Sequence, residues 1–292
     1  MRFRGNDLRT LCVLCCALFA LSSCMRSKKH PPQIEDELIV ENIEEHRSEA
    51  DLPHLHTPSK TQQALYQEAR TALKNGEDSI AFEALKNLSV TQTTSAPKRD
   101  GTLLYAGMLE QRGQRREAIE LLEALIPQIP PSGDVFLVLA RMQQAEGLLD
   151  DSERSLRDAT RSAPELLRAW VALAQLLETN GRHDAAEDAM LHYEREVYRI
   201  GAQVEHGATL EQRLEAIAQF QVALPDPRIS RILARALKND AFDVQSAALG
   251  ALERVGTDNA LEAVENYRKN ATSAALQKRA DQVLEAINAR HP

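Results

Sequence analysis

The sequence predicts an all-α protein, built as a helical solenoid in which pairs of helices repeat along the chain. Glycines recur at a constant spacing of 34 residues in the middle of the chain, and amphipathic stretches with helical periodicity flank each of them. A second periodicity, of 32 residues, follows toward the C-terminus. The hydrophobic fraction of 43% is enough for a buried core in a chain of 292 residues.

Composition argues against several classes of protein. The chain holds 43 acidic against 35 basic side chains and only 4% aromatic residues, which disfavours a nucleic-acid binder, because such proteins carry a basic face and stacking aromatics. All four cysteines lie in the first 24 residues, which excludes a disulfide framework and a structural zinc domain for the rest of the chain. We expect no metal, no cofactor and no small-molecule substrate.

Residues 1–23 have the pattern of a signal peptide. Three arginines precede the apolar run Leu11–Leu21, whose eleven residues span roughly 16 Å as a helix, about half of the ~30 Å hydrocarbon core of a bilayer. The run is therefore too short for a membrane-spanning helix. It ends at Leu21-Ser22-Ser23-Cys24, where the serines supply the small side chains that cleavage before Cys24 requires.

These four residues resemble the lipobox of bacterial lipoproteins. The resemblance implies that Cys24 carries a diacylglyceryl group and becomes the first mature residue, so that two or three acyl chains hold the protein on a membrane. Met25 follows instead of Asp, which by the rule for enteric bacteria favours the outer membrane, facing the periplasm. The inner membrane stays open, as does a plain signal peptide that is cut elsewhere and leaves Cys24 unmodified. Removing residues 1–23 leaves 32 basic and 42 acidic side chains, a net charge of −10.

Residues 24–59 are expected to form a disordered acidic tether. From residue 25 onward they contain eight acidic residues, four histidines and four prolines without hydrophobic periodicity. His54 and His56 have no fixed carboxylate or cysteine nearby in sequence that would complete a metal site. We therefore interpret them as part of a solvated linker.

Residues 60–200 contain the 34-residue repeat. Gly113, Gly147 and Gly181 are each 34 residues apart, and Gly76 precedes them by 37. Each glycine lies where a tight turn between two helices needs a positive φ. Small residues recur seven positions before and five positions after each glycine, which allows the paired helices to approach closely; they are Ala69, Ala106, Ala140 and Ala174 before it, and Ala81, Ala118, Ser152 and Ala186 after it.

This pattern resembles the tetratricopeptide repeat, a helix–turn–helix unit of 34 residues, and the resemblance implies about four such units. Trp170 lies at the family's aromatic position four, and Phe136 lies at the matching position one repeat earlier. Two units depart from the family pattern. The first carries a three-residue insertion around Thr91–Pro97, and the fourth has Tyr198 where proline is usual.

Residues 207–292 show the 32-residue step, which aligns amphipathic stretches at 211–220, 244–255 and 276–287 and leaves 228–237 and 259–267 between them. Asp226 and Pro227 are typical of a helix start, with Asp as the cap and Pro in the first turn. The stretch Val244–Leu252 resembles the second helix of a HEAT-type repeat. The alternative is a continuation of degenerate tetratricopeptide repeats to the end of the chain.

The resemblance to the tetratricopeptide repeat implies a concave wall, formed by the first helix of each unit. Such a wall binds a partner helix or an extended peptide. Arg70, Arg141 and Arg168 are the wall residues of most interest, because arginine recognises carboxylates with paired hydrogen bonds. A solvated surface charge is the alternative for each of them. The residues predicted to line this face are Tyr66, Arg70, Leu103, Glu110, Leu137, Arg141, Gln144, Arg168, Val171, Gln175 and Glu178. Trp170 is expected to pack in the core.

No catalytic motif stands out. Ser95-x-x-Lys98 lies between repeats and lacks its partner motifs, and His183 with Glu187 is expected to be a surface ion pair. We therefore expect no enzymatic activity. The sequence predicts a lipid-anchored scaffold or adaptor that binds other proteins of the bacterial cell envelope. The alternative is a surface-displayed lipoprotein with a structural or host-facing binding role.

Overall fold

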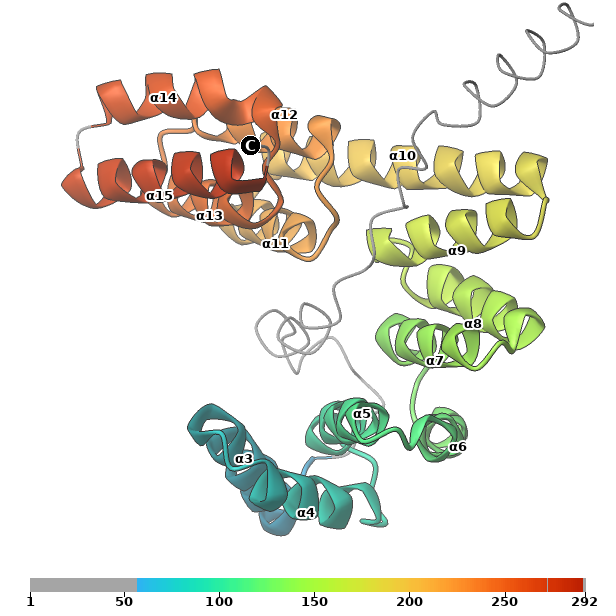
Figure 1. Cartoon of the computed structure of the whole chain (residues 1–292). Coiled ribbons are helices and arrows are strands. Elements are labelled where there is room, and N and C mark those ends of the chain that lie inside the picture. The colour runs from blue at the N-terminus through green and yellow to red at the C-terminus, as the bar shows by residue number, and fades with distance from the viewer. Residues whose placement is uncertain (1–56, 272, 291–292) are drawn as a thin grey trace, which may run out of the picture. The chain divides into compact units, whose positions relative to one another are not determined.

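The computed structural model describes residues 57–271 and 273–290, which all belong to one compact unit. The predicted signal peptide, Cys24 and nearly all of the predicted tether lie outside these ranges. Helix accounts for 81% of the described residues, and none of them lies in a strand (Figure 1). The prediction of an all-α protein is confirmed for this part of the chain.

Four pairs of antiparallel neighbours make up the first part of this unit. Within each pair the two helices pack on each other, and contacts between α4 and α5, α6 and α7, and α8 and α9 join successive pairs. The pairs are α3 (Lys60–Asn75) with α4 (Asp78–Ser89), α5 (Ala96–Gln111) with α6 (Arg115–Leu125), α7 (Gly133–Ala145) with α8 (Leu149–Ser162), and α9 (Leu167–Thr179) with α10 (His183–His206).

The turn inside each pair has the same hydrogen-bonded geometry. Gly76, Gly113, Gly147 and Gly181 have φ values of 72°, 77°, 79° and 73°, which confirms the predicted left-handed conformation. The residue after each glycine donates its backbone N–H to the carbonyl five residues earlier, at 2.8 Å in all four turns. This is the Schellman motif, which ends the first helix and aims the second one back along it.

The small residues predicted on both sides of each glycine are buried between the paired helices. In the third pair a hydrogen bond shows this approach directly, because Ser152 Oγ of α8 donates to the carbonyl oxygen of Ala140 in α7 at 2.8 Å. Leu85, Leu122 and Leu156, nine residues after their glycines, are also buried. Small residues thus set the close spacing, and the leucines fill the core beside them.

Five helices follow, and their positions agree with the predicted stretches to within a few residues. Helices α11, α13 and α15 pack side by side, α12 packs on α13, and α14 packs on α15 (Figure 1). Their bounds are α11 (Leu210–Gln221), α12 (Pro227–Ala236), α13 (Phe242–Val255), α14 (Leu261–Asn270) and α15 (Ala274–Arg290). Asp226 caps α12 as predicted, since its side chain accepts a hydrogen bond from the Arg228 backbone N–H at 2.6 Å.

Helix α10 joins the two parts of the unit. It continues without a break through residues 201–206, between the two segments predicted from the repeats, and ends at His206. One hydrophobic cluster extends from Leu167 in α9 to Ile287 in α15, and Val197, Ile200 and Val204 of α10 lie within it. The two predicted segments therefore share a core across α10.

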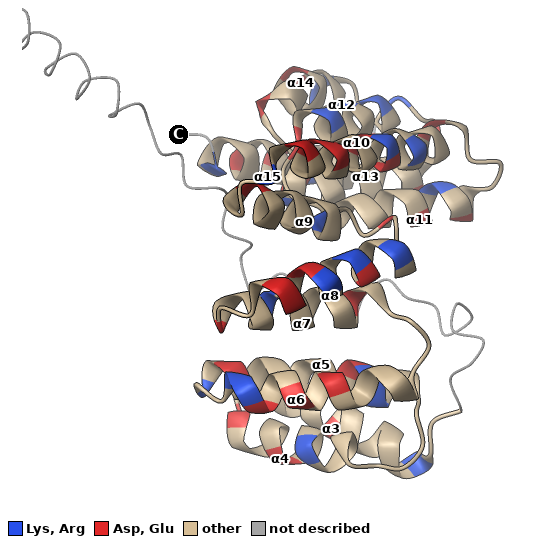
Figure 2. Cartoon of the chain, turned by 90° about the vertical axis from the view of Figure 1, so that its right-hand side faces the viewer, with Lys and Arg blue, Asp and Glu red and all other residues tan. Residues whose placement is uncertain are grey.

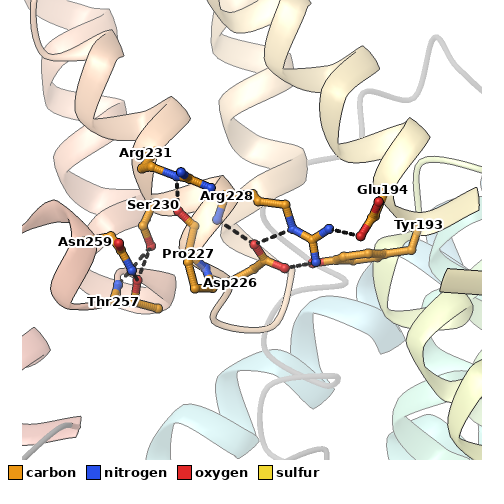
Figure 3. Close-up of polar contacts among 9 residues, drawn as sticks. All are labelled: Tyr193, Glu194, Asp226, Pro227, Arg228, Ser230, Arg231, Thr257 and Asn259. Carbon is orange, nitrogen blue, oxygen red and sulfur yellow. Dashed lines mark hydrogen bonds and ion pairs between the residues drawn. The ribbon is translucent and has the colours of Figure 1, made fainter. Parts of the chain in front are cut away.

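Polar contacts reinforce the same junction (Figure 3). The buried Tyr193 of α10 donates its hydroxyl hydrogen to Asp226 Oδ2 at 2.9 Å, and Arg228 in the first turn of α12 forms an ion pair with Glu194. Burial is the main cause that raises the pKa of the Tyr193 hydroxyl above its usual value, with the Asp226 charge adding to it. The Tyr193 hydroxyl therefore stays protonated and donates its hydrogen to Asp226. This hydrogen bond connects α10 to the start of α12.

Candidate protein-binding site

The residues predicted to line a concave face differ in how exposed they are. Gln144 and Glu178 are exposed, whereas Arg70, Glu110, Arg141, Val171 and Gln175 are partly buried. Four others are buried in the folded chain: Tyr66, Leu103, Leu137 and Arg168. The four buried side chains pack within the chain. The accessible part of the predicted face therefore consists of the two exposed and the five partly buried residues.

Glu110 and Arg141, two of the predicted residues, lie in direct contact. Arg141 Nη2 is 2.5 Å from Glu110 Oε2, and Arg115 Nε is 3.0 Å from Glu110 Oε1. Arg115 also reaches Glu146, at 3.4 Å. The hydrogen bond to Glu110 is the main cause that raises the pKa of the Arg115 guanidinium above its usual value. These charges connect α5, α6 and α7, so a partner carboxylate would compete with Glu110 for Arg141.

The other two predicted arginines also have contacts within the chain. The Arg70 guanidinium carbon lies 5.9 Å from the centroid of the Tyr66 ring, within the range of a cation–π contact. Arg168 is buried on α9. The structure therefore offers the two exposed residues, Gln144 and Glu178, as the more accessible probes of this face.

A cleft of about 390 Å³ lies between α8, α9 and α10. Its floor comes from α9, where Trp170, Leu173 and Leu177 recur at helical spacing on one face. Side chains of the two neighbouring helices form its sides, Arg157, Thr160 and Arg161 from α8 and Ala185, Asp188, Ala189 and His192 from α10. The volume is within the usual range of ligand-binding clefts.

Trp170 has a fixed orientation in this cleft. Its ring stacks on the His192 ring with centroids 4.8 Å apart and planes 11° apart, and its Nε1–H donates to the Pro164 carbonyl at 2.9 Å. Trp170 packs against the core, as expected, but it is only partly buried and lines the cleft as well. Sequence patterns gave no signal for this stack, because 22 residues separate the two rings.

The rim of the cleft carries charges of both signs. Arg157 pairs with Glu153 at 2.7 Å, and Arg161 pairs with Asp158 at 2.5 Å, while Asp188 lies on the opposite side. Figure 2 shows the same mixture of acidic and basic residues along α8. An apolar and aromatic floor with a mixed charged rim suits a peptide segment better than a single anion.

His183 forms its ion pair with a residue other than the expected one. His183 Nδ1 lies 2.9 Å from Glu178 Oε1, across the turn between α9 and α10, and Glu187 is not its partner. This hydrogen bond raises the pKa of the His183 imidazole above 6.5. Both side chains are exposed, so the pair is a feature of the surface.

Ser95 and Lys98 contribute to local structure. Ser95 caps α5 by accepting a hydrogen bond from the Lys98 backbone N–H at 3.3 Å. The Lys98 ammonium donates to the Thr91 carbonyl at 2.5 Å and to the side chain of Gln128 at 3.3 Å. Burial lowers the pKa of Lys98. These contacts close the loop that precedes α5 and connect it to the end of the second pair.

No protein-family model matches the chain, and no curated protein is significantly similar to it. The residues that the structure describes contain no cluster of three or more metal-ligating side chains. Among the same residues, no helix is long and apolar enough to cross a membrane.

Proposed function

We propose that this protein is a membrane-anchored lipoprotein that acts as a protein–protein scaffold or adaptor in the bacterial cell envelope. In this proposal its helical unit is a solenoid of four tetratricopeptide repeats followed by HEAT-like repeats. The anchor is Cys24, after cleavage of residues 1–23, and the favoured location is the outer membrane with the helical unit in the periplasm. The protein has no enzymatic role.

The observation that carries the binding role is the fourfold recurrence of one helix–turn–helix unit. Gly76, Gly113, Gly147 and Gly181 occupy the same place in four helix pairs and have nearly the same φ. Stacked helix pairs of this kind contact mainly their neighbours, which leaves long helix faces available to a partner. Such faces bind partner helices or extended peptides.

The α8–α9–α10 cleft is the most favourable position for an anchoring side chain of the partner. Trp170 is an aromatic surface that is already oriented by His192 and Pro164, so binding costs little side-chain entropy there. Gln175 and Glu178 follow on another face of α9, so a partner segment that crosses α9 contacts both surfaces. Aromatic residues in such positions are frequent binding hot spots.

The anchor rests on the lipobox-like residues that end at Cys24. The net charge of −10 after cleavage disfavours flat binding of the protein to anionic lipid, so we expect the helical unit to extend from the membrane on residues 24–59.

Metabolic labelling with a palmitate analogue tests the proposed lipid anchor at Cys24. The full chain should be labelled and sediment with membranes, whereas Cys24→Ala should lose both properties. A labelled Cys24→Ala protein would contradict the proposed anchor.

In-cell photocrosslinking tests the adaptor role. A photoreactive residue at the exposed Gln144 of the full chain is expected to crosslink to one dominant envelope protein, which mass spectrometry identifies. A probe at Val90, which is exposed on a different part of the chain, is the matched control. If Gln144 crosslinks only to the chain itself or to nothing, the proposed binding role of this face is wrong.

Protease treatment of intact cells distinguishes a periplasmic protein from a surface-displayed one, since only the surface-displayed protein is digested.

A further inference from the structure

Helix α10 carries an exposed stripe that no other described helix covers. Leu191 is 52% exposed and Tyr198 is 62% exposed, although both are large and hydrophobic. Asp188, Arg195 and Ala202 are exposed as well, and the five residues follow one another at spacings of three and four. Residues at these spacings lie on one face of a helix and form the contact line of a coiled coil. At 24 residues, α10 is long enough for such a contact.

The charges on this stripe reverse along the helix. Asp184, Glu187 and Asp188 are exposed at its N-terminal end, and Arg195 and Arg199 are exposed toward its C-terminal end. Both arginines contact residues of α10 itself, since Arg199 pairs with Glu196 at 2.6 Å and Arg195 approaches His192 at 3.5 Å. Among the exposed charged side chains, the acidic ones therefore lie at the N-terminal end and the arginines toward the C-terminal end, with Leu191 between them and Tyr198 beside the arginines. The partly buried Glu194, Glu196 and Glu205 in the same half of α10 pair with Arg228, Arg199 and Arg235.

From this pattern we infer that α10 pairs in an antiparallel arrangement with α10 of a second copy of the chain, so that the protein forms a two-fold symmetric dimer. A two-fold interface must be complementary to itself, because each copy supplies the same surface. A stripe with acid at one end and base at the other meets this requirement when the second helix runs in the opposite direction.

The register of this pair follows from the spacing. With the two-fold axis near position 193, Leu191 lies beside the aliphatic stem of Arg195 of the second copy, and Asp188 lies beside Tyr198 of the second copy. The Tyr198 hydroxyl then donates to a carboxylate, and Arg199 lies next to the acidic end of the other helix. Because of the symmetry, every one of these contacts forms twice. Leu191 and Tyr198 lose contact with water in both copies.

A second copy fits this stripe better than an unrelated protein. A reversal of charge along one helix makes the stripe complementary to itself, which a two-fold pair requires and a different partner does not. The stripe shares Asp188 with the rim of the cleft, whereas Trp170, Leu173 and Leu177 of the floor belong to α9 and are not part of the stripe. This inference does not depend on the lipid anchor or on the partner of the cleft.

Crosslinking in cells tests whether the stripe contacts a second copy. A photoreactive residue replaces Leu191 in the full chain, and the control probe is at Val90. The expected result is a covalent dimer of the chain from position 191 and none from position 90. A crosslink from position 191 to a different protein, or no crosslink, overturns the inference.

Charge reversal then tests the direction of pairing. The acidic-end variant Glu187→Lys/Asp188→Lys and the basic-end variant Arg195→Glu/Arg199→Glu should each lose the dimer, since positions 187, 188, 195 and 199 then carry charges of the same sign in each variant. Mixing the two variants under different epitope tags should restore a mixed dimer, which also shows that both variants fold. The matched control is Glu262→Lys/Glu265→Lys, at two exposed residues of α14, which should keep the dimer. The antiparallel arrangement is overturned if the acidic-end and basic-end variants each still form a dimer on their own, or if the mixture forms no mixed dimer.

Discussion

Substitution of Asp226 by alanine should destabilise the junction between α10 and α12 by about 3 kcal/mol. Asp226 accepts hydrogen bonds from the Tyr193 hydroxyl at 2.9 Å and from the Arg228 backbone N–H at 2.6 Å, and it is 8% exposed (Figure 3). Loss of the helix cap costs about 1 kcal/mol. A buried Tyr193 hydroxyl without its acceptor costs about 2 kcal/mol more.

A double-mutant cycle separates these two contributions. Tyr193→Phe removes the hydroxyl and leaves Asp226 bonded to Arg228, so it should cost only about 1 kcal/mol. In the Tyr193→Phe background, Asp226→Ala should then cost only the cap, again about 1 kcal/mol. The difference between the two backgrounds is a coupling of about 2 kcal/mol between the side chains.

Hydrogen exchange of the α12 amides in the full chain measures this coupling. A change of about 2 kcal/mol in the free energy of local opening corresponds to a change of about 30-fold in exchange rate, so Asp226→Ala should accelerate α12 exchange about 30-fold less in the Tyr193→Phe background. Ser230→Ala, at the next buried polar contact of α12 with Thr257, should not alter the coupling between Tyr193 and Asp226. Additive effects of the two substitutions would refute the reasoning.

Three further predictions concern the turns, the core and the surface. Gly147→Ala should cost about 1 kcal/mol in urea unfolding, because φ of 79° is unfavourable for any residue with a Cβ; an unchanged midpoint would contradict this. Gly201→Val should cost about 1–3 kcal/mol in the same assay, since its Cβ would lie 2.7 Å from Ile232 Cδ1 in α12 and valine gains little helix propensity over glycine; a neutral effect would mean that the two helices are farther apart. NMR titration should show that Glu178→Gln lowers the His183 pKa toward 6.5. The pair with Glu178 stabilises the fold below the unfolded pKa and loses this effect as pH rises through the raised pKa, so an unchanged titration would show that the pair does not form.

The helix pairs were predictable because the signals that define them are local. A glycine that needs a positive φ, with small residues seven positions before and five positions after it, specifies a turn and two contact points within about 13 residues. The turns at Gly113, Gly147 and Gly181 follow from this alone. The cap at Asp226 was predictable for the same reason, since a cap depends on residues next to it in sequence.

The end of α10 was less predictable because it depends on contacts distant in sequence. The spacing of the repeats predicts a segment end near residue 200, and Gly201 follows directly, yet the helix continues to His206. Gly201 lies inside the helix, and its missing side chain makes room for Ile232 of α12. Gly207 ends the helix. A glycine can end a helix or allow another helix to pack closely. Which of these roles each of two nearby glycines has depends on the residues that pack against it.

The candidate site was predictable only in part for similar reasons. The resemblance to a repeat family names positions on the first helix of each unit, but burial depends on the neighbouring helices. Leu103 and Leu137 are buried for this reason, and Glu110 holds Arg141. The contact between Trp170 and His192 arises from the way that α9 and α10 pack. No spacing rule in the sequence relates these two residues.

The central proposal is that this helical unit binds another envelope protein, and a photoprobe scan along the full chain in cells tests it most directly. Probes at Gln144, Glu178 and Arg161 sample the predicted face and the rim of the cleft, and probes at Val90 and Glu262 sample exposed positions elsewhere. The proposal predicts that one envelope protein crosslinks to the first three positions and not to the last two. Equal labelling of all five positions, or no crosslinked protein at the first three, would contradict it.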